Sequence, residues 1–369
     1  MELTSIPSVF EPDINYTVKL SEDVVFESKM PEIPKKCSVT IDLNGHDILF
    51  KHEIENSLDI CTTNYKEHNN EYMGLITNNG SLNIVGEGEI SAYIADYNYI
   101  MTKESRNFDD LMAKCAAVIN NGYLKIGTDA CVNCYTTVTI SDGTISNPFI
   151  RSGYADLFVY GFAVMNNGES DICGELNTKV ISMSYAGGSA NSYHSAAAYG
   201  IFGGSVNIYG GKISADAGSG AAGSSSSCRE KNKITELAVG VFSNDLNISG
   251  NVQIDADVSA WMSTNQWDCW KDGIVYQVSA GVMYEGKNYP KIDSGCSISA
   301  GYSRLDNAQI IIPGSDKYST EKSYTVLSPD ACKNQYRFAA SVAGIHCLSQ
   351  SAYAENDSEE VMDSGWFNS

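Results

Sequence analysis

A segment that recurs along the chain at nearly constant spacing constrains the fold more than any other sequence feature. Residues 75–84 (LITNNGSLNI) return as residues 117–126 (AVINNGYLKI), and shorter copies start at residues 163, 200, 240 and 281. These starts lie 37 to 46 residues apart. Self-similarity at such a period is typical of solenoids and propellers, in which each repeat buries its apolar face against its neighbours.

Each copy has the same internal order of residue types. An apolar triplet precedes an Asn/Gly turn, an alternating strand such as residues 246–248 (LNI), a glycine turn and a second alternating strand such as residues 252–256 (VQIDA). Alternation with a period of two places one face of each strand inward. We therefore expect three short strands per coil, with the remaining residues of each period forming a loop at one corner.

A β-propeller is the alternative fold, because its blades repeat at a similar period. Propeller blades need four antiparallel strands and usually carry Trp-Asp or kelch-type signatures, which this sequence lacks. The chain also lacks long Ala/Leu/Glu/Lys runs with a 3.6-residue period, so helix is expected to be a minor ingredient. The repeat therefore favours a solenoid of stacked coils.

Three motifs link this repeat to a known fold. They are residues 38–48 (SVTIDLNGHDI), the repeated Asn-Asn-Gly-x-Leu-x-Ile pattern and the Gly-Gly-x-Ile-Ser corner at residues 210–214. In these motifs the sequence resembles the right-handed parallel β-helix proteins of the pectate-lyase-like superfamily, over roughly residues 15–312. The resemblance implies an all-β, right-handed parallel β-helix solenoid with long corner loops and capped ends. It implies no single function, because that superfamily holds lyases, hydrolases, adhesins and phage spikes.

The flanking residues differ from the repeat and divide the chain into three parts. Residues 1–35, which contain four prolines, are expected to form an extended segment and cap over the first coil. Residues 36–312 are expected to form the β-helix, in which residues 218–227 (GSGAAGSSSS) are expected to be a flexible loop. Residues 313–369 are expected to form a C-terminal cap with an acidic tail.

Charge and composition restrict the partners. The 24 Lys and Arg residues against 45 Asp and Glu residues give a formal net charge of −21, which disfavours nucleic acid and anionic membrane surfaces. No run of about 18 apolar residues exists, so no membrane insertion is expected. The N-terminus lacks the basic and apolar regions of an export signal, and the eleven cysteines indicate reduced thiols made in a cytosol.

Metal and cofactor sites are not indicated by the sequence. Cys131 and Cys134 have the spacing of half a zinc site or of a redox pair, but no second pair completes it. A loop with two reduced thiols is the simpler interpretation. The five histidines are dispersed, and His194, placed in a loop between coils, lacks an identifiable carboxylate partner for general-base catalysis. Neither a metal nor a cofactor is therefore expected.

Asp255 and Asp257 are the candidate catalytic residues for an enzymatic function, which ranks below a non-enzymatic one. They alternate on one expected strand and so share a face, where two carboxylates can act on a sugar or hold calcium. Outward-facing aspartates are also ordinary solvated surface on so acidic a solenoid. The polygalacturonase-like motif set is absent, and the chain is poor in the arginine that a pectate lyase needs beside a uronate. We therefore expect no catalytic residues and rank non-enzymatic function first.

A tryptophan-rich segment supplies the candidate binding residues. Residues 261–272 hold three of the four tryptophans, and their candidate sugar-contacting side chains are Trp261, Trp267, Asp268, Trp270 and Asp272. Aromatic faces stack on pyranose rings, and carboxylates accept hydrogen bonds from sugar hydroxyls. The same segment also fits a protein-interface anchor or a satellite core against the solenoid wall.

These observations favour a non-enzymatic structural or adhesive protein. A β-helix without an export signal fits a bacteriophage virion component, such as a head or tail fibre, spike or decoration protein, made in the host cytoplasm. Its expected partners are other virion or surface proteins and host surface glycans, and its expected assembly is a homotrimer by analogy with β-helical spikes. The alternatives are an extracellular polysaccharide lyase or glycoside hydrolase, or a sugar-binding module, of the same superfamily.

Overall fold

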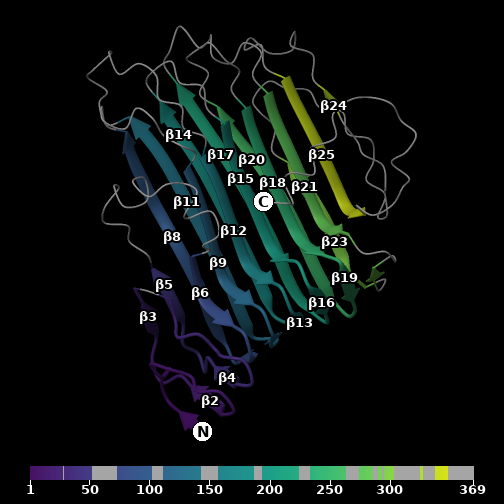
Figure 1. The fold of residues 1–369 in the computed structure, drawn as a ribbon. Coiled ribbons are helices and arrows are strands. Elements are labelled where there is room, and N and C mark those ends of the chain that lie inside the picture. The colour runs from purple at the N-terminus through teal and green to yellow at the C-terminus, as the bar shows by residue number, and fades with distance from the viewer. Residues whose placement is uncertain are drawn as a thin grey trace.

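The computed structural model of the protein describes residues 1–27, 29–51, 73–101, 111–142, 157–186, 193–223, 233–262, 274–285, 290–292, 295–302, 325–326 and 337–347. Within these ranges the regular structure is β-strand and no helix occurs. The strands form three sheets, which are named A, B and C here. Figure 1 shows their long strands lying side by side from the purple N-terminal end to the yellow C-terminal end.

Sheet A contains nine strands, all paired in parallel. In spatial order they are β1 (Glu2–Leu3), β2 (Asn15–Lys19), β4 (Ser38–Asp42), β7 (Ser81–Val85), β10 (Tyr123–Ile126), β13 (Glu169–Ile172), β16 (Ser205–Ile208), β19 (Asp245–Ile248) and β22 (Lys291–Ile292).

Sheet B contains eight strands, also paired in parallel. They are β3 (Val24–Phe26), β5 (Ile48–Lys51), β8 (Gly88–Met101), β11 (Ala130–Asp142), β14 (Glu175–Ala186), β17 (Gly211–Gly223), β20 (Val252–Met262) and β23 (Ser297–Tyr302).

Sheet C contains seven parallel strands and ends on an antiparallel one, because β24 pairs antiparallel with β25. The strands are β6 (Met73–Asn78), β9 (Leu111–Asn120), β12 (Leu157–Asn166), β15 (Tyr193–Phe202), β18 (Lys233–Ser243), β21 (Ile274–Tyr284), β25 (Arg337–Cys347) and β24 (Thr325–Val326).

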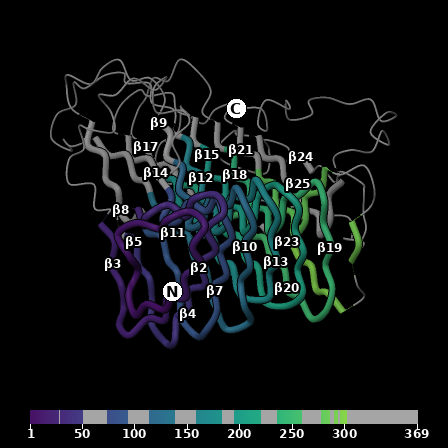
Figure 2. The backbone as a smooth tube through the Cα atoms, turned by 60° about the horizontal axis from the view of Figure 1, so that its bottom comes forward, coloured from purple at the N-terminus to yellow at the C-terminus, as the bar shows by residue number. Residues whose placement is uncertain are grey.

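From β6 onward, successive strands belong to sheets C, A and B in turn, and this order repeats through β23. Figure 2 shows the corresponding turns of the chain following one another in sequence order. Each strand therefore pairs with its counterparts one period earlier and one period later. The all-β fold with long parallel sheets agrees with the prediction at that level, and the order of the sheets is compatible with a β-helix solenoid.

The connections between sheets differ in length. From β6 to β20, a strand of sheet C leads into sheet A through one or two residues, as at residues 121–122, and sheet A leads into sheet B through two or three, as at residues 127–129. In the last coil these two connections have six and four residues, at residues 285–290 and 293–296. The residues between a sheet B strand and the next sheet C strand are more numerous, as at residues 143–156 and 263–273. From β6 to β21, the longest connection of each coil therefore occurs at the same step of the repeat, between sheets B and C.

The strands of sheets B and C are longer than predicted. β8 has 14 residues and β18 has 11, whereas the repeat pattern predicted short strands throughout. Several segments predicted as loops are accordingly strand: residues 218–223 belong to β17, His194 to β15 and the Cys131–Cys134 pair to β11. Small or polar side chains gave these segments a loop-like composition, but pairing with both neighbouring strands keeps them extended.

The core follows from the alternation within each repeat. One isoleucine per strand forms a continuous column in sheet A, from Ile41 in β4 through the register-matched Ile84, Ile126, Ile172, Ile208 and Ile248. All six are fully buried. Burying such a side chain stabilises a fold by about 1.5–3 kcal/mol. The column therefore holds successive coils together.

The repeated Asn-Asn-Gly motif forms two ladders where sheet C meets sheet A. The first asparagine of each pair is fully buried: Asn78 donates from Nδ2 to Asn120 Oδ1, and Asn120 donates likewise to Asn166 Oδ1, each at 2.7 Å. The second asparagines form an outer ladder of opposite direction, in which Asn121 donates from Nδ2 to Asn79 Oδ1 and Asn167 donates to Asn121 Oδ1, each at 2.8 Å. The repeated asparagines thus supply hydrogen-bond partners to one another between adjacent coils.

The glycine of this motif is required by the close approach of adjacent coils. A Cβ atom on Gly122 would lie 2.0 Å from the carbonyl oxygen of Gly80, and one on Gly168 would lie 2.0 Å from that of Gly122. Real Cβ atoms do not approach an oxygen so closely. Only glycine therefore fits this corner at the observed spacing of the coils.

Residues 1–35, predicted as a cap, contain β1, β2 and β3, which are the first strands of sheets A and B. The following residues pair with the first strand of sheet C, because Met30 and Ile33 donate backbone hydrogen bonds to Leu75 and Thr77 of β6. The backbone of this N-terminal region thus covers the edge of β6. Residues 313–336 and the acidic tail lie almost wholly outside the described residues.

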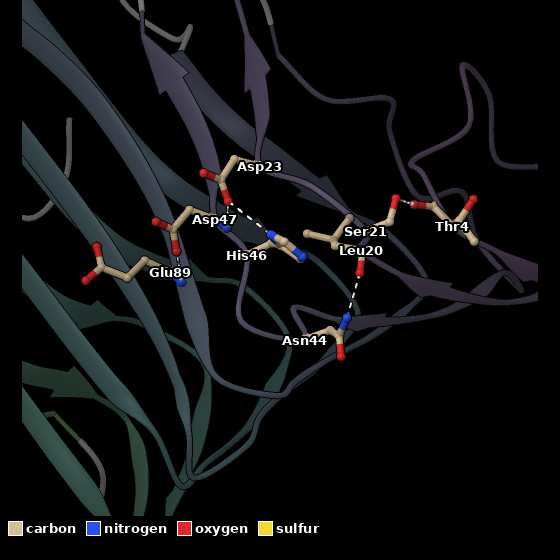
Figure 3. Close-up of polar contacts among 8 residues, drawn as sticks. All are labelled: Thr4, Leu20, Ser21, Asp23, Asn44, His46, Asp47 and Glu89. Atoms are coloured by element: carbon tan, nitrogen blue, oxygen red, sulfur yellow. Dashed lines mark hydrogen bonds and ion pairs between the residues drawn. The ribbon is translucent and has the colours of Figure 1, made fainter.

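The Asn44-Gly45 turn organises the polar contacts of the first coils (Figure 3). Both residues have positive φ, at 51° and 84°, which asparagine and glycine tolerate best. Asn44 donates from Nδ2 to the Leu20 carbonyl at 2.9 Å, and His46 Nδ1 lies 3.3 Å from Asp23 Oδ1. The residues that carried the family resemblance therefore serve here as a structural corner.

Candidate functional site: the outer face of sheet B

The outer face of sheet B brings the candidate carboxylates together with neighbouring polar side chains. Asp255 and Asp257 lie on β20, two residues apart, between β17 and β23. Buried Ile254, Ala256 and Val258 alternate with them, so both aspartates lie on the face away from the core. The predicted sharing of a face by the two carboxylates follows from this strand.

The Asp255 carboxylate is held by two donors. Gln253 donates from Nε2 to Oδ2 at 2.6 Å, and Ser299 on β23 donates from Oγ to Oδ1. Both oxygens therefore accept a hydrogen bond from a side chain of the same face. These contacts fix the carboxylate while leaving lone pairs for further donors, such as hydroxyl groups.

Asp257 lies beside other carboxylates. Its register partner on β17 is Asp216, and its own strand carries Asp255. Burial, followed by repulsion from Asp216 and Asp255, raises the pKa of Asp257 above its usual value. On the other side, Asp257 is opposite Gly301, where a Cβ atom would lie 2.0 Å from its Oδ1. The Asp257 carboxylate thus occupies the space that a side chain at position 301 would need.

One lysine offsets this negative charge. Lys179 on β14 is the register partner of Asp216, and its Nζ lies 3.6 Å from Asp216 Oδ2. Both side chains are about half exposed, so the pair contributes little to stability. The face therefore presents carboxylates in excess of cations, which disfavours an anionic ligand such as a uronate.

A row of amide and hydroxyl groups continues the line of Asp255 across the sheet. Asn133 Nδ2 donates to Ser91 Oγ at 3.0 Å, Asn177 Nδ2 donates to Asn133 Oδ1 at 3.0 Å, and Ser214 Oγ donates to Asn177 Oδ1 at 2.6 Å. In register order the row consists of Ser91, Asn133, Asn177, Ser214, Asp255 and Ser299. Adjacent strands lie about 4.8 Å apart, so the row is a regular linear array.

Two tyrosines lie in the row of Lys179, Asp216 and Asp257. Tyr93 and Tyr135 stack with ring centroids 5.0 Å apart and an interplanar angle of 21°. Each ring therefore packs one of its faces against the other. Burial raises the pKa of Tyr135 to about 12, so its hydroxyl stays protonated.

The Cys131-x-x-Cys134 pair does not form one site. On a strand, residues three apart lie on opposite faces, and Cys131 is partly exposed on the outer face whereas Cys134 is buried in the core. Burial, with Glu89 and Glu175 adding to it, raises the pKa of Cys131 to about 11, which keeps it a neutral thiol. In the described part of the chain, no group of three or more His, Cys, Asp or Glu residues is placed to hold a metal ion.

The tryptophan-rich segment is described only at its start. The backbone of Trp261 lies at the C-terminal end of strand β20, where the sequence predicted a loop. Trp267, Asp268, Trp270 and Asp272 lie outside the described residues. The segment that contains them directly follows the strand of Asp255 and Asp257.

Glu236 is a buried carboxyl group that sequence reasoning missed. It lies on β18, is fully buried and contacts Ser219 of sheet B and Gln277 of sheet C. Burial raises the pKa of Glu236 to about 8, although hydrogen bonds from Ser219 and Gln277 act in the opposite direction. No sequence pattern marks it, because the residues from Thr235 to Ser243 are all buried and hydrophobicity does not distinguish the inner face of this strand.

Comparison with known proteins adds no relatives. A scan of protein-family models, a search of curated proteins and a search of solved structures each give no match to this chain. Among the described residues there is no helix of the length and apolar character needed to cross a bilayer.

Proposed function

We propose that this protein is a non-enzymatic structural and adhesive protein, built as a right-handed parallel β-helix that acts as a rigid scaffold. The observation that carries this proposal is the continuity of side-chain contacts from coil to coil. The isoleucine column, the two asparagine ladders and the polar row of sheet B each link register-matched residues of successive strands. Such contacts favour a stiff body over one that opens and closes around a substrate.

In this proposal the outer face of sheet B contacts glycans. Ser91 and Asn133 of the polar row are buried, so the accessible groups are those of Asn177, Ser214, Asp255 and Ser299, which suit sugar hydroxyls as donors and acceptors. The excess of carboxylates on the face favours neutral or amino sugars over uronates. Trp261, Trp267, Asp268, Trp270 and Asp272 remain the candidate stacking and hydrogen-bonding residues, since their segment continues from β20.

Binding is tested with immobilised neutral, amino and uronate glycans. Asp255→Asn is expected to weaken binding of a neutral glycan by about tenfold, because each lost charge-assisted hydrogen bond is worth about 1.5 kcal/mol or more. Trp267→Ala is expected to weaken it further. Asp129→Asn, an exposed aspartate on the turn before β11, serves as the matched control. Equal binding by all three variants, or a preference for uronates, contradicts the proposal.

The assembly is proposed from the family resemblance alone. By analogy with β-helical spikes, we propose a homotrimer that forms part of a bacteriophage virion, is made in the host cytoplasm and contacts other virion proteins. Light scattering of the full chain tests this proposal. A mass of three chains supports it, whereas a monomer of 39.9 kDa at micromolar concentration contradicts it.

A glycoside hydrolase is the second candidate function, and one observation favours it. Residues two apart on a strand lie about 6.6–6.8 Å apart, which overlaps the separation of about 6.5–9.5 Å between the carboxyl groups of inverting glycosidases. The raised pKa of Asp257 suits a general acid, and Asp255 would then act as the base. Release of new reducing ends that disappears in both Asp255→Asn and Asp257→Asn would establish this function in place of the first.

A further inference from the structure

Glu236 receives only hydrogen-bond donors. The Ser219 backbone N donates to Glu236 Oε1 at 2.8 Å, the Ser219 Oγ donates to the same oxygen, and Gln277 Nε2 donates to Oε2 at 2.7 Å. A carboxylate that accepts several such bonds is stabilised in its ionised form. The arrangement of donors is therefore that of a binding site for a negative charge.

Among the residues that the structure describes, no cation is paired with this charge. Within the described residues, none of the ion pairs includes Glu236, and the charged group that acts on it is another carboxylate, Asp216. Lys179, on the neighbouring β14, is paired with Asp216 on the outer face. A buried ion without compensation is costly, so a positive charge has to be supplied from outside the chain or the carboxylate has to be protonated.

Three buried oxygen atoms near Glu236 have no hydrogen-bond partner. They are Gln277 Oε1, on the side chain that donates to Glu236, Ser182 Oγ and Ser279 Oγ. Ser182 is the register partner of Ser219, and Ser279 lies two residues after Gln277 on the same face of β21. Unpartnered buried oxygens are rare in folded proteins and call for a ligand, an ion or water.

We propose that the core oxygen cluster of Ser182, Ser219, Glu236, Gln277 and Ser279 binds a monovalent cation, Na⁺ or K⁺, between sheets B and C. A proton neutralises Glu236 and supplies one O–H donor, which can partner at most one of the three free oxygens, whereas an alkali cation supplies the charge and can be coordinated by several oxygens. One carboxylate with otherwise neutral oxygens balances a single positive charge, so a divalent ion would leave an excess charge in the core.

Thermal unfolding of the full chain tests the site. At pH 9 and equal ionic strength, Na⁺ or K⁺ chloride is expected to raise Tm by about 2–5 °C over choline chloride, with a logarithmic dependence on concentration. The rise is expected to vanish in Glu236→Gln, which keeps the shape of the side chain. It is expected to persist in Glu89→Gln, which alters an exposed carboxylate on sheet B. Equal Tm values in all salts overturn the proposal.

Competition with protons separates a cation from a proton. The salt-specific rise is expected to be smaller at pH 5 than at pH 9, because protonated Glu236 cannot hold the cation. The charged group that acts on Glu236 from a packed strand is Asp216 on β17, which is paired with Lys179 on β14. By backbone position, the other titratable residues on the neighbouring strands are Lys233 at the start of β18 and His194 on β15. A pH-dependent Tm without any salt preference means that a proton alone occupies the site and overturns the proposal.

A crystal of the wild-type chain soaked in Rb⁺ provides a direct measurement. An anomalous peak within coordination distance of the Glu236 carboxylate supports the site and does not depend on whether Glu236→Gln folds. Density for ordered water alone, with no anomalous signal, overturns it.

Discussion

Two groups of buried polar side chains, the inner asparagine ladder and the core oxygen cluster around Glu236, obtain hydrogen-bond partners in different ways. Where sheet C meets sheet A, Asn78, Asn120 and Asn166 repeat at register-matched positions, and each donates to the next. Between sheets B and C, Glu236 has no such repeat, because its register partners are Ala196 and Gln277. A neutral amide is both donor and acceptor and can extend along a stack of coils, whereas a single carboxylate only accepts. Repetition along the coils therefore satisfies neutral polar groups, whereas a single buried carboxylate needs a proton or a cation to balance its charge.

The largest loss of stability is expected from replacing the glycine of the Asn-Asn-Gly motif, next to the asparagine ladders. Gly122→Ala forces a Cβ to within 2.0 Å of the Gly80 carbonyl oxygen, so adjacent coils have to separate. A loss of about 4 kcal/mol in the free energy of unfolding is expected, measured by urea denaturation. Gly210→Ala is the matched control, because its Cβ would meet only the Cys173 carbonyl oxygen at 3.6 Å. Similar losses in the two variants would contradict the close-approach argument.

Removing the middle asparagine of the inner ladder is expected to cause the next largest loss of stability. Asn120→Ala leaves the Asn78 donor and the Asn166 acceptor without their partner, and each buried unsatisfied group costs about 1–3 kcal/mol. We expect the free energy of unfolding to fall by about 3 kcal/mol, measured by urea denaturation. Asn121→Ala, in the exposed ladder, is expected to cost less than about 0.5 kcal/mol. A smaller loss for Asn120→Ala than for Asn121→Ala would show that the buried ladder is not structural.

The buried carboxyl group of Glu236 predicts a dependence of stability on pH. The pKa of Glu236 is raised to about 8 in the folded chain, so the folded state binds the proton more tightly than the unfolded state. In choline buffers, the stabilisation of the folded state by protonated Glu236 is fully present at low pH. This stabilisation decreases as pH rises from the unfolded pKa of Glu to about 8, by at most about 1.4 kcal/mol per pH unit. At pH 6, Glu236→Gln is therefore expected to raise the free energy of unfolding by about 2 kcal/mol.

The corresponding measurement is a series of urea titrations of the wild type and Glu236→Gln between pH 5 and pH 9. The two curves are expected to converge at pH 5 and to separate toward pH 8. A constant difference between them at all pH values would mean that Glu236 does not titrate in this range.

The smallest effect is expected at the surface. Asp257→Asn removes repulsion from Asp216 and Asp255, but the side chain is exposed and solvent screens its charge. We expect a change in the free energy of unfolding of less than about 0.5 kcal/mol, with a stabilising sign near neutral pH. Thermal unfolding at low salt measures it. A large destabilisation would place Asp257 in a structural role like that of the buried polar side chains.

Some features of the site followed from the sequence because they depend on local geometry alone. Asp255 and Asp257 share a face since side chains on a strand alternate with a period of two. By the same rule, Cys131 and Cys134 lie on opposite faces, but this followed only once residues 130–142 were known to be strand. Predicting residues 218–223 as loop failed for a related reason. Glycine and serine have low strand propensity by themselves, and pairing with β14 and β20 overrides it.

The sequence by itself determined the repeat, the alternation within it and therefore an all-β chain of stacked parallel strands, because apolar side chains at a period of two have to be buried along every strand. Only the tertiary structure decided which alternating positions of sheet C face the core. All residues from Thr235 to Ser243 are buried, so hydrophobicity marks neither face as the inner one. The contacts of Glu236 with Ser219 and Gln277, residues far from it in the chain, placed its carboxylate between two sheets. A buried charge is set by what packs around it, and that information lies in the neighbouring coils.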